Sequence, residues 1–168
     1  PERLLAEVDA AIPEEPAGEE LVGALLRLVA GSNHLHHPGY VGHQVATVLP
    51  HAALAEAVHA LLNNGMAVYE MGQLQTVMER RVVEFLAGRL GFPPRAGGVL
   101  THGGSVGNLT ALLAARQAQA GYDVWREGQR EPFAVLVSDQ AHYCIARAVQ
   151  VMGWGKDGAI AVPTDARY

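Results

Sequence analysis

A glycine-rich turn between a short apolar run and a helix-forming run constrains this chain most. Val99-Leu100 precedes the turn Gly103-Gly104-Ser105, and a stretch rich in Leu and Ala continues to Arg116. The pattern predicts a strand, a tight turn and a helix N-terminus, where free backbone N–H groups and the helix dipole favour an anion, most often a phosphate. The simpler interpretation is a helix cap with Ser105 as the N-cap residue. The turn alone leaves both interpretations open.

The turn matches neither of two common nucleotide-binding motifs. A P-loop requires a Lys followed by Ser or Thr after its second glycine, and none is present. The glycine spacing of a dinucleotide fingerprint, G-x-G-x-x-G, also differs from Gly103-Gly104-Ser105-Val106-Gly107.

Strand-like and helix-like segments alternate in the second half of the chain. Residues Phe133–Val137 are predicted to form a buried strand, a helical stretch continues to Met152, and Ala159–Val162 is expected to be the next strand. This alternation from Val99 to Val162 predicts an α/β fold with a mostly parallel sheet and helical crossovers. Because a last parallel strand needs neighbours, we expect the first part of a larger α/β fold.

The first half is predicted to be helical, with one long loop. Helices are expected over Leu4–Ile12, Glu19–Ala30, Ala52–Leu62 and Gln73–Leu90, the last with apolar residues at steps of three and four. Residues His34–Pro50 have no regular period and contain several Pro and Gly, so we expect an extended, ordered loop.

Charge and cysteine content exclude several classes of protein. A net charge of -5 without a basic cluster argues against a nucleic-acid partner. No apolar run approaches the roughly 18 residues of a membrane span. Cys144 is the only cysteine, which excludes a disulfide within the chain and fits a reducing, cytoplasmic compartment. We expect Cys144 to be a small buried side chain on a helix.

Five blocks of the sequence resemble one family. They are His37–Tyr40, Leu62–Met71, the Gly-Gly-Ser turn, Ser138–Tyr143 and Val162–Asp165. Together they resemble the group II decarboxylases that use pyridoxal 5'-phosphate (PLP), the family of aromatic amino-acid, glutamate and related decarboxylases. The resemblance implies a fold-type I PLP-transferase-like fold, incomplete in this chain. It also implies that residues 1–48, with N-terminal helices and a pocket loop, pack on a dimer partner, and that residues 49–168 begin the large PLP-binding domain.

The resemblance assigns cofactor contacts to the turn and to a histidine. Gly103, Gly104 and Ser105 would hold the phosphate of PLP. His142 follows a predicted parallel strand, at the end where open α/β sheets place ligands. In the family, the histidine of this block stacks on the pyridine ring near the bond that breaks, so His142 is expected to be both cofactor-binding and catalytic. Asn108 either supports the turn or is a surface residue of the helix.

The resemblance also points to a substrate-binding loop. His43 and Gln44 lie where the family's pocket loop meets the substrate. Glutamate decarboxylases carry a Gln near this point and aromatic decarboxylases carry aromatic residues, so His43 leaves the substrate open. Packing within the loop is the alternative role for both residues. Glu70 is expected to be a bonded carboxylate or a dimer contact rather than a catalytic group.

The chain lacks one group that PLP chemistry requires. PLP binds a protein lysine as a Schiff base, and the only lysine here, Lys156, falls in a predicted exposed turn, Gly153–Gly158. The resemblance places the family's His-Lys block and its Asp-x-Ala block later in the polypeptide, and no His-Lys pair occurs in this chain. We therefore expect the chain to work with a C-terminal remainder of the same polypeptide that carries the Schiff-base lysine.

The leading functional hypothesis is a cytoplasmic, homodimeric decarboxylase, a carboxy-lyase that removes the α-carboxylate of an amino acid as CO2. One alternative is a PLP-dependent aldehyde synthase or lyase on the same scaffold. Another is a non-catalytic scaffold or binding protein with a PLP-type fold. No metal site is expected, because His34, His36 and His37 are too close in sequence to share a helix face and lack acidic or Cys ligands nearby.

Overall fold

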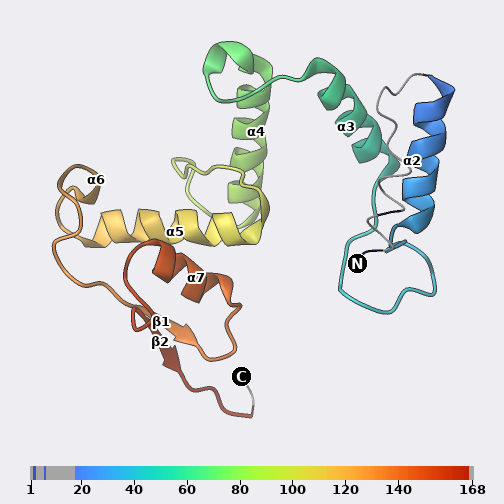
Figure 1. Ribbon diagram of the computed structural model, residues 1–168. Coiled ribbons are helices and arrows are strands. Elements are labelled where there is room, and N and C mark those ends of the chain that lie inside the picture. The colour runs from blue at the N-terminus through green and yellow to red at the C-terminus, as the bar shows by residue number, and fades with distance from the viewer. Residues whose placement is uncertain (1, 3–5, 7–17, 167–168) are drawn as a thin grey trace. The chain divides into compact units, whose positions relative to one another are not determined.

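The computed structural model describes residues 2, 6 and 18–166 and forms two compact units, residues 1–64 and 65–168 (Figure 1). The first contains helices α2 (Glu19–Gly31) and α3 (Pro50–Leu62). The second contains, in order, the 3₁₀ helix η1 (Tyr69–Met71), α4 (Gln73–Arg89), α5 (Gly103–Gln119), α6 (Val124–Glu127), β1 (Val135–Ser138), α7 (Cys144–Val151) and β2 (Ala159–Val162).

Helices α2 and α3 carry residues suited to helix ends. Glu19 and Glu20 lie in the first turn of α2, where carboxylates interact well with the helix dipole. Pro50 opens α3, and Asn63 ends it in the left-handed conformation with φ 49°. The predicted helices at 19–30 and 52–62 are thus confirmed, as is the loop between them. The predicted helix Leu4–Ile12 lies outside the described residues.

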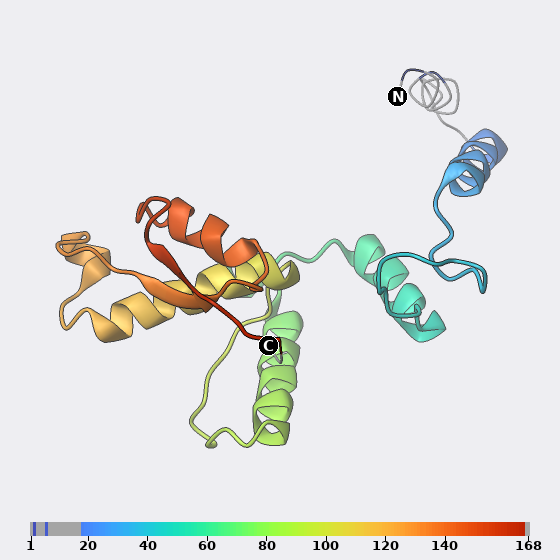
Figure 2. The same ribbon diagram turned by 90° about the horizontal axis from the view of Figure 1, so that it is seen from below.

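The core of the second unit is the β1–α7–β2 motif. The two strands are parallel, with Val135 opposite Ala159 and Ser138 opposite Val162, and α7 is the crossover between them. The buried side chains of α7 are Cys144, Ala148 and Val149, of which Val149 is completely buried. Figures 1 and 2 show α7 beside both α5 and the strands. The predicted parallel sheet with a helical crossover is confirmed here.

The expected strand at Val99-Leu100 is not formed. In the described part of the chain, these two residues belong to no helix or strand. Instead of joining a ladder, the Leu100 N–H donates to Oε1 of Glu79 on α4, at 2.7 Å. A strand exists only when a neighbour pairs with it, and the only sheet among the described residues has the two strands β1 and β2.

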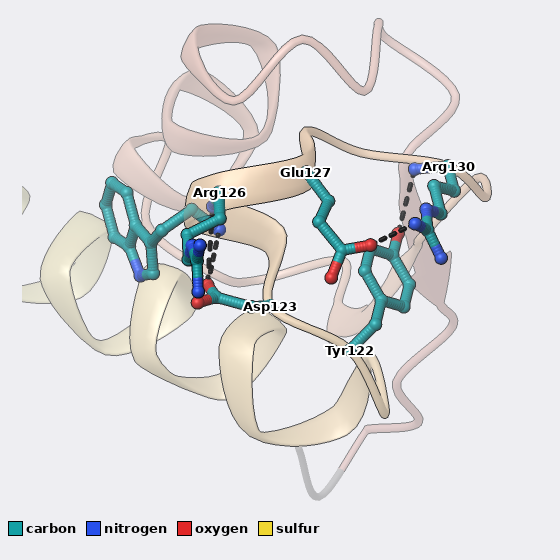
Figure 3. A network of polar contacts seen from close by, with 6 residues as sticks. Tyr122, Asp123, Arg126, Glu127 and Arg130 are labelled. Atoms are coloured by element: carbon teal, nitrogen blue, oxygen red, sulfur yellow. Dashed lines mark hydrogen bonds and ion pairs between the residues drawn. The ribbon is translucent and has the colours of Figure 1, made fainter.

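A compact turn around α6 returns the chain from α5 to β1 (Figure 3). Asp123 is the N-cap of α6, and its Oδ1 accepts the backbone N–H groups of Trp125 at 3.1 Å and Arg126 at 3.3 Å. The hydroxyl of Tyr122 accepts the backbone N–H of Arg130 at 2.8 Å. These side chains satisfy the backbone of a loop that has no strand partner.

The boundary between the two units follows α3. The structure divides the chain after Asn64, whereas the sequence analysis divides it between residues 48 and 49, so α3 joins the first unit. The assignment of residues 1–48 to a dimer contact stays a prediction. Among the described residues, no helix is both long enough and apolar enough to cross a membrane.

We expect Gly158→Ala to lower the free energy of unfolding of the full polypeptide by about 1–3 kcal/mol, the usual scale of overpacking in a core. A Cβ on Gly158 would lie 2.6 Å from Cβ of Trp154 and 2.9 Å from Cγ1 of Val149. Gly97→Ala is the matched control, because a Cβ there meets nothing within 4 Å. Urea unfolding curves measure both changes, and equal effects of the two substitutions would contradict this packing.

Candidate functional site

The glycine turn forms the beginning of α5. His102 is the N-cap residue and makes no side-chain capping bond, and Gly103 adopts φ 75°. Only glycine takes this left-handed conformation without strain. The helix thus starts before Ser105, and the prediction that Ser105 is the N-cap is wrong: Ser105 lies in the first turn.

The turn leaves room for an anion. The first backbone N–H groups of a helix have no partner within the helix, and they carry its partial positive charge. Gly103, Gly104 and Ser105 are all exposed, and a Cβ on Gly104 would meet nothing within 4 Å. The structure thus brings together the three residues predicted to hold a phosphate, at the start of a helix of 17 residues.

His142 lies between the end of β1 and the start of α7. Its Nδ1 accepts the backbone N–H of Cys144 at 3.2 Å, and its ring centroid lies 4.2 Å from that of Tyr143 at a tilt of 36°. The side chain is otherwise exposed. In a neutral imidazole one nitrogen accepts and the other carries the proton, so Nε2 is left as the donor.

A hydrogen bond joins the start of α5 to the start of α7. Nδ2 of Asn108 donates to Sγ of Cys144 at 3.1 Å. Asn108 follows Ser105 by about one helical turn, and Cys144 is two residues beyond His142. This hydrogen bond therefore links the helix that begins at the glycine turn to the segment that carries His142, the histidine predicted to stack on the cofactor. Cys144 is buried, as predicted, but the sequence did not predict its bond to Asn108.

Asp139 and Thr164 form a second link that the sequence analysis missed. The Thr164 hydroxyl donates to Oδ1 of Asp139 at 2.8 Å, and the Thr164 backbone N–H donates to Oδ2 at 3.3 Å. These bonds lower the pKa of Asp139 below its ordinary value. The Thr164 hydroxyl contributes most, the Thr164 amide comes next, and the Gln140 side chain adds a smaller contribution. Desolvation acts in the opposite direction and raises the pKa. The sequence could have indicated this link, because Asp139 and Thr164 follow the ends of two strands predicted to be parallel neighbours.

The predicted substrate loop belongs to the first unit. His43 and Gln44 are exposed in the segment between α2 and α3, so their place at a site in the second unit stays a prediction. A Cβ on Gly42 would lie 2.5 Å from the hydroxyl oxygen of Tyr40, so the Tyr40 ring covers this glycine.

The remaining candidates are individually placed. Glu70 is exposed in η1, and Lys156 is exposed in the turn before β2, as predicted for the lysine. Nδ1 of His37 accepts the backbone N–H of Gly39 at 3.0 Å. Within the ranges that the structure describes, no three His, Cys, Asp or Glu side chains are grouped so that they could hold a metal ion.

We expect the neutral His142 ring to carry its proton on Nε2, because Nδ1 accepts the Cys144 amide. Nitrogen-15 NMR of the histidine rings of the full polypeptide, at a pH where they are neutral, measures the tautomer. The His142→Phe variant identifies the signal by its loss. A His142 ring with the proton on Nδ1 would contradict this hydrogen bond.

Comparisons of the sequence and of the fold relate this chain to known proteins. The family model described as "Pyridoxal-dependent decarboxylase conserved domain" matches residues 1–168. A glutamate decarboxylase-like protein of Gibberella zeae is 34% identical over 127 residues, which are 75% of this chain and 24% of that protein. The L-2,4-diaminobutyrate decarboxylase of Rhizobium meliloti is 29% identical over 165 residues, which are 95% of this chain and 32% of that protein.

The fold comparison agrees with the sequence comparisons. The crystal structure of mouse CSAD superimposes with a TM-score of 0.87 at 25% identity, covering 99% of this chain and 35% of that one. This likeness confirms the predicted incomplete fold-type I architecture. The chain spans between about a quarter and about a third of the proteins it matches. The chain belongs to the family of pyridoxal-dependent decarboxylases, which are carboxy-lyases.

Proposed function

We propose that the polypeptide containing this chain is a PLP-dependent decarboxylase that removes the α-carboxylate of an amino acid as CO2. One observation carries the proposal: the bond from Asn108 to Cys144 ties the open helix start at Gly103–Ser105 to the loop of His142. A phosphate cradle and a flat, exposed ring on neighbouring elements are what a phosphorylated aromatic aldehyde requires.

The residues present fit the cofactor of the family. The exposed N–H groups of Gly103 and Gly104 and the hydroxyl of Ser105 would hold the phosphate, with no Cβ on Gly104 to obstruct it. When bound, PLP takes up the electron pair left on the substrate carbon as carbon dioxide departs.

His142 would act as a platform and as a donor. Its flat ring suits stacking on an electron-poor ring, and the bond from Cys144 to Nδ1 restricts rotation of the imidazole. Because Nδ1 is occupied, Nε2–H is the group available to substrate. His142 would thus orient the substrate and hold a proton at Nε2, which is the catalytic role we assign to it.

The substrate contacts and partners complete the proposal. His43 and Gln44 would contact the amino acid from the loop between α2 and α3, where both are exposed. The C-terminal remainder of the polypeptide would supply the lysine that binds PLP. That remainder and a second subunit of a homodimer would cover apolar side chains of α4 that are 44–66% exposed, such as Val82, Phe85 and Leu74. The single, buried Cys144 is consistent with a cytoplasmic enzyme.

We expect the full polypeptide with PLP to release CO2 and the corresponding amine from at least one amino acid of a panel that includes glutamate, aspartate, 2,4-diaminobutyrate and aromatic amino acids. His142→Phe should keep the cofactor but lower turnover by about 10²–10⁴-fold, the range for a lost acid–base group. Release of carbon dioxide measures turnover, product analysis identifies the amine, and the absorbance of bound PLP measures retention of the cofactor. An aldehyde product would favour the aldehyde synthase, and a wild-type protein that binds no PLP would favour a non-catalytic scaffold.

We expect Ser105→Ala to weaken PLP binding by about 1–3 kcal/mol, the usual value of a hydrogen bond to a charged group. Equilibrium titration of the cofactor-free full polypeptide measures the change. Thr110→Val, further along α5, is the control, because its hydroxyl donates to the Val106 carbonyl within the helix. Unchanged affinity in Ser105→Ala would show that the hydroxyl does not contact the phosphate.

A further inference from the structure

The carboxyl ends of β1 and β2 are joined beyond the sheet itself. The ladder ends at Ser138 opposite Val162, and the Asp139 N–H donates to the Val162 carbonyl at 3.1 Å. The Asp139 carboxylate then accepts both the hydroxyl and the backbone N–H of Thr164. Three hydrogen bonds therefore connect the first residue after β1 to the end of β2 and the residues that follow it.

The loop of residues 138–143 is held by hydrogen bonds at both of its ends. The Ala141 N–H donates to the Ser138 carbonyl at 2.9 Å, and the Gln140 N–H donates to the Ser138 hydroxyl at 3.1 Å. At the far end, Nδ1 of His142 accepts the N–H of Cys144, whose side chain is buried. The loop that carries His142 is thus held between the buried Cys144 of α7 and the Asp139–Thr164 pair just beyond the ends of β1 and β2.

Packing does little to fix this loop. Asp139, Gln140, Ala141 and His142 are exposed, and the Tyr143 side chain is 59% exposed. With so few apolar contacts, the conformation depends on polar bonds, and bonds to an ionised carboxylate are the strongest of these. Such bonds order a loop before ligand arrives, which is the condition for accurate placement of a catalytic group.

We propose that Asp139 and Thr164 are positioning residues that hold the loop of residues 138–143, and with it the His142 ring, in its working orientation. This inference rests on the proposed function, because it gives the pair the task of fixing the ring that would contact the cofactor. Neither residue touches the reacting atoms. Their effect passes through the loop backbone to His142.

The geometry requires a carboxylate at position 139 and a hydroxyl at position 164. Oδ1 of Asp139 accepts the Thr164 hydroxyl and the Gln140 side-chain amide, while Oδ2 accepts the Thr164 N–H. Asparagine has one acceptor oxygen, so Asp139→Asn places an NH₂ group against one of these donors. Thr164→Val removes the hydroxyl but keeps the shape, and Thr164→Ser restores the hydroxyl.

The test compares four variants of the full polypeptide: Asp139→Asn, Thr164→Val, Thr164→Ser and the control Asp157→Asn. Asp157 is an exposed carboxylate in the turn before β2 and takes no part in the link. Amide hydrogen exchange of the cofactor-free proteins measures opening of residues 139–144. We expect exchange there to rise about tenfold or more in Asp139→Asn and Thr164→Val, the scale of one hydrogen bond to a charged group. Thr164→Ser and the control should match the wild type.

The loaded proteins supply the second readout. Asp139→Asn and Thr164→Val should lower kcat by about 10–100-fold, as expected for a small misplacement of a catalytic group. They should also reduce the circular dichroism of bound PLP, with smaller changes in KM, and Thr164→Ser should restore both signals.

Three results would overturn the positioning role: unchanged exchange in the loop, faster exchange throughout the protein, or a looser loop with wild-type kcat and dichroism. Failure of the proposed function is a separate result. In that case the wild-type protein itself binds no PLP or releases no CO2, and the positioning role falls with it.

Discussion

The parallel pairing of β1 with β2 determines the place of the crossover helix α7 and of the loop that carries His142. Two parallel strands cannot be joined by a tight turn, so the chain crosses over through α7 and buries Val149 beneath it. The same pairing brings the ends at Ser138 and Val162 to one edge. Open α/β sheets bind their ligands at that edge, and here it carries the loop of His142 and the Asp139–Thr164 link.

The sequence predicted the elements whose signals are local. The predicted helices match α2, α3 and α4 to within about two residues, and the run from Phe133 to Val137 predicted a strand that the structure places at Val135–Ser138. The sequence placed the glycine turn at a helix start, but the alternative role of Ser105 as the N-cap is wrong, because α5 begins at Gly103. Local propensity favours serine at a cap, whereas the positive φ of Gly103 is visible only in the structure.

The features that the sequence did not predict depend on partners far along the chain. Val99-Leu100 has the composition of a strand, but Leu100 bonds to Glu79, 21 residues away, and not to a neighbouring strand. Asn108 and Cys144 are 36 residues apart, and Asp139 and Thr164 are 25 apart. The periodicity of apolar residues along the sequence does not indicate which distant residues form hydrogen bonds. They follow from topology, and the bond between Asp139 and Thr164 could have been inferred once the strands were taken as parallel neighbours.

Hydrogen bonds rather than apolar packing therefore hold the loop of His142 in place. The buried side chains of α7 fix the helix, but His142 precedes them on a loop whose residues are exposed. In the proposed function the His142 ring meets both a cofactor and an entering substrate. Burial cannot fix such a ring, because it would close the site. Hydrogen bonds from Cys144 on one side and Thr164 on the other restrain the loop while leaving the ring accessible. Exposure of His142 and order of its loop are thus compatible, and the carboxylate of Asp139 makes them so.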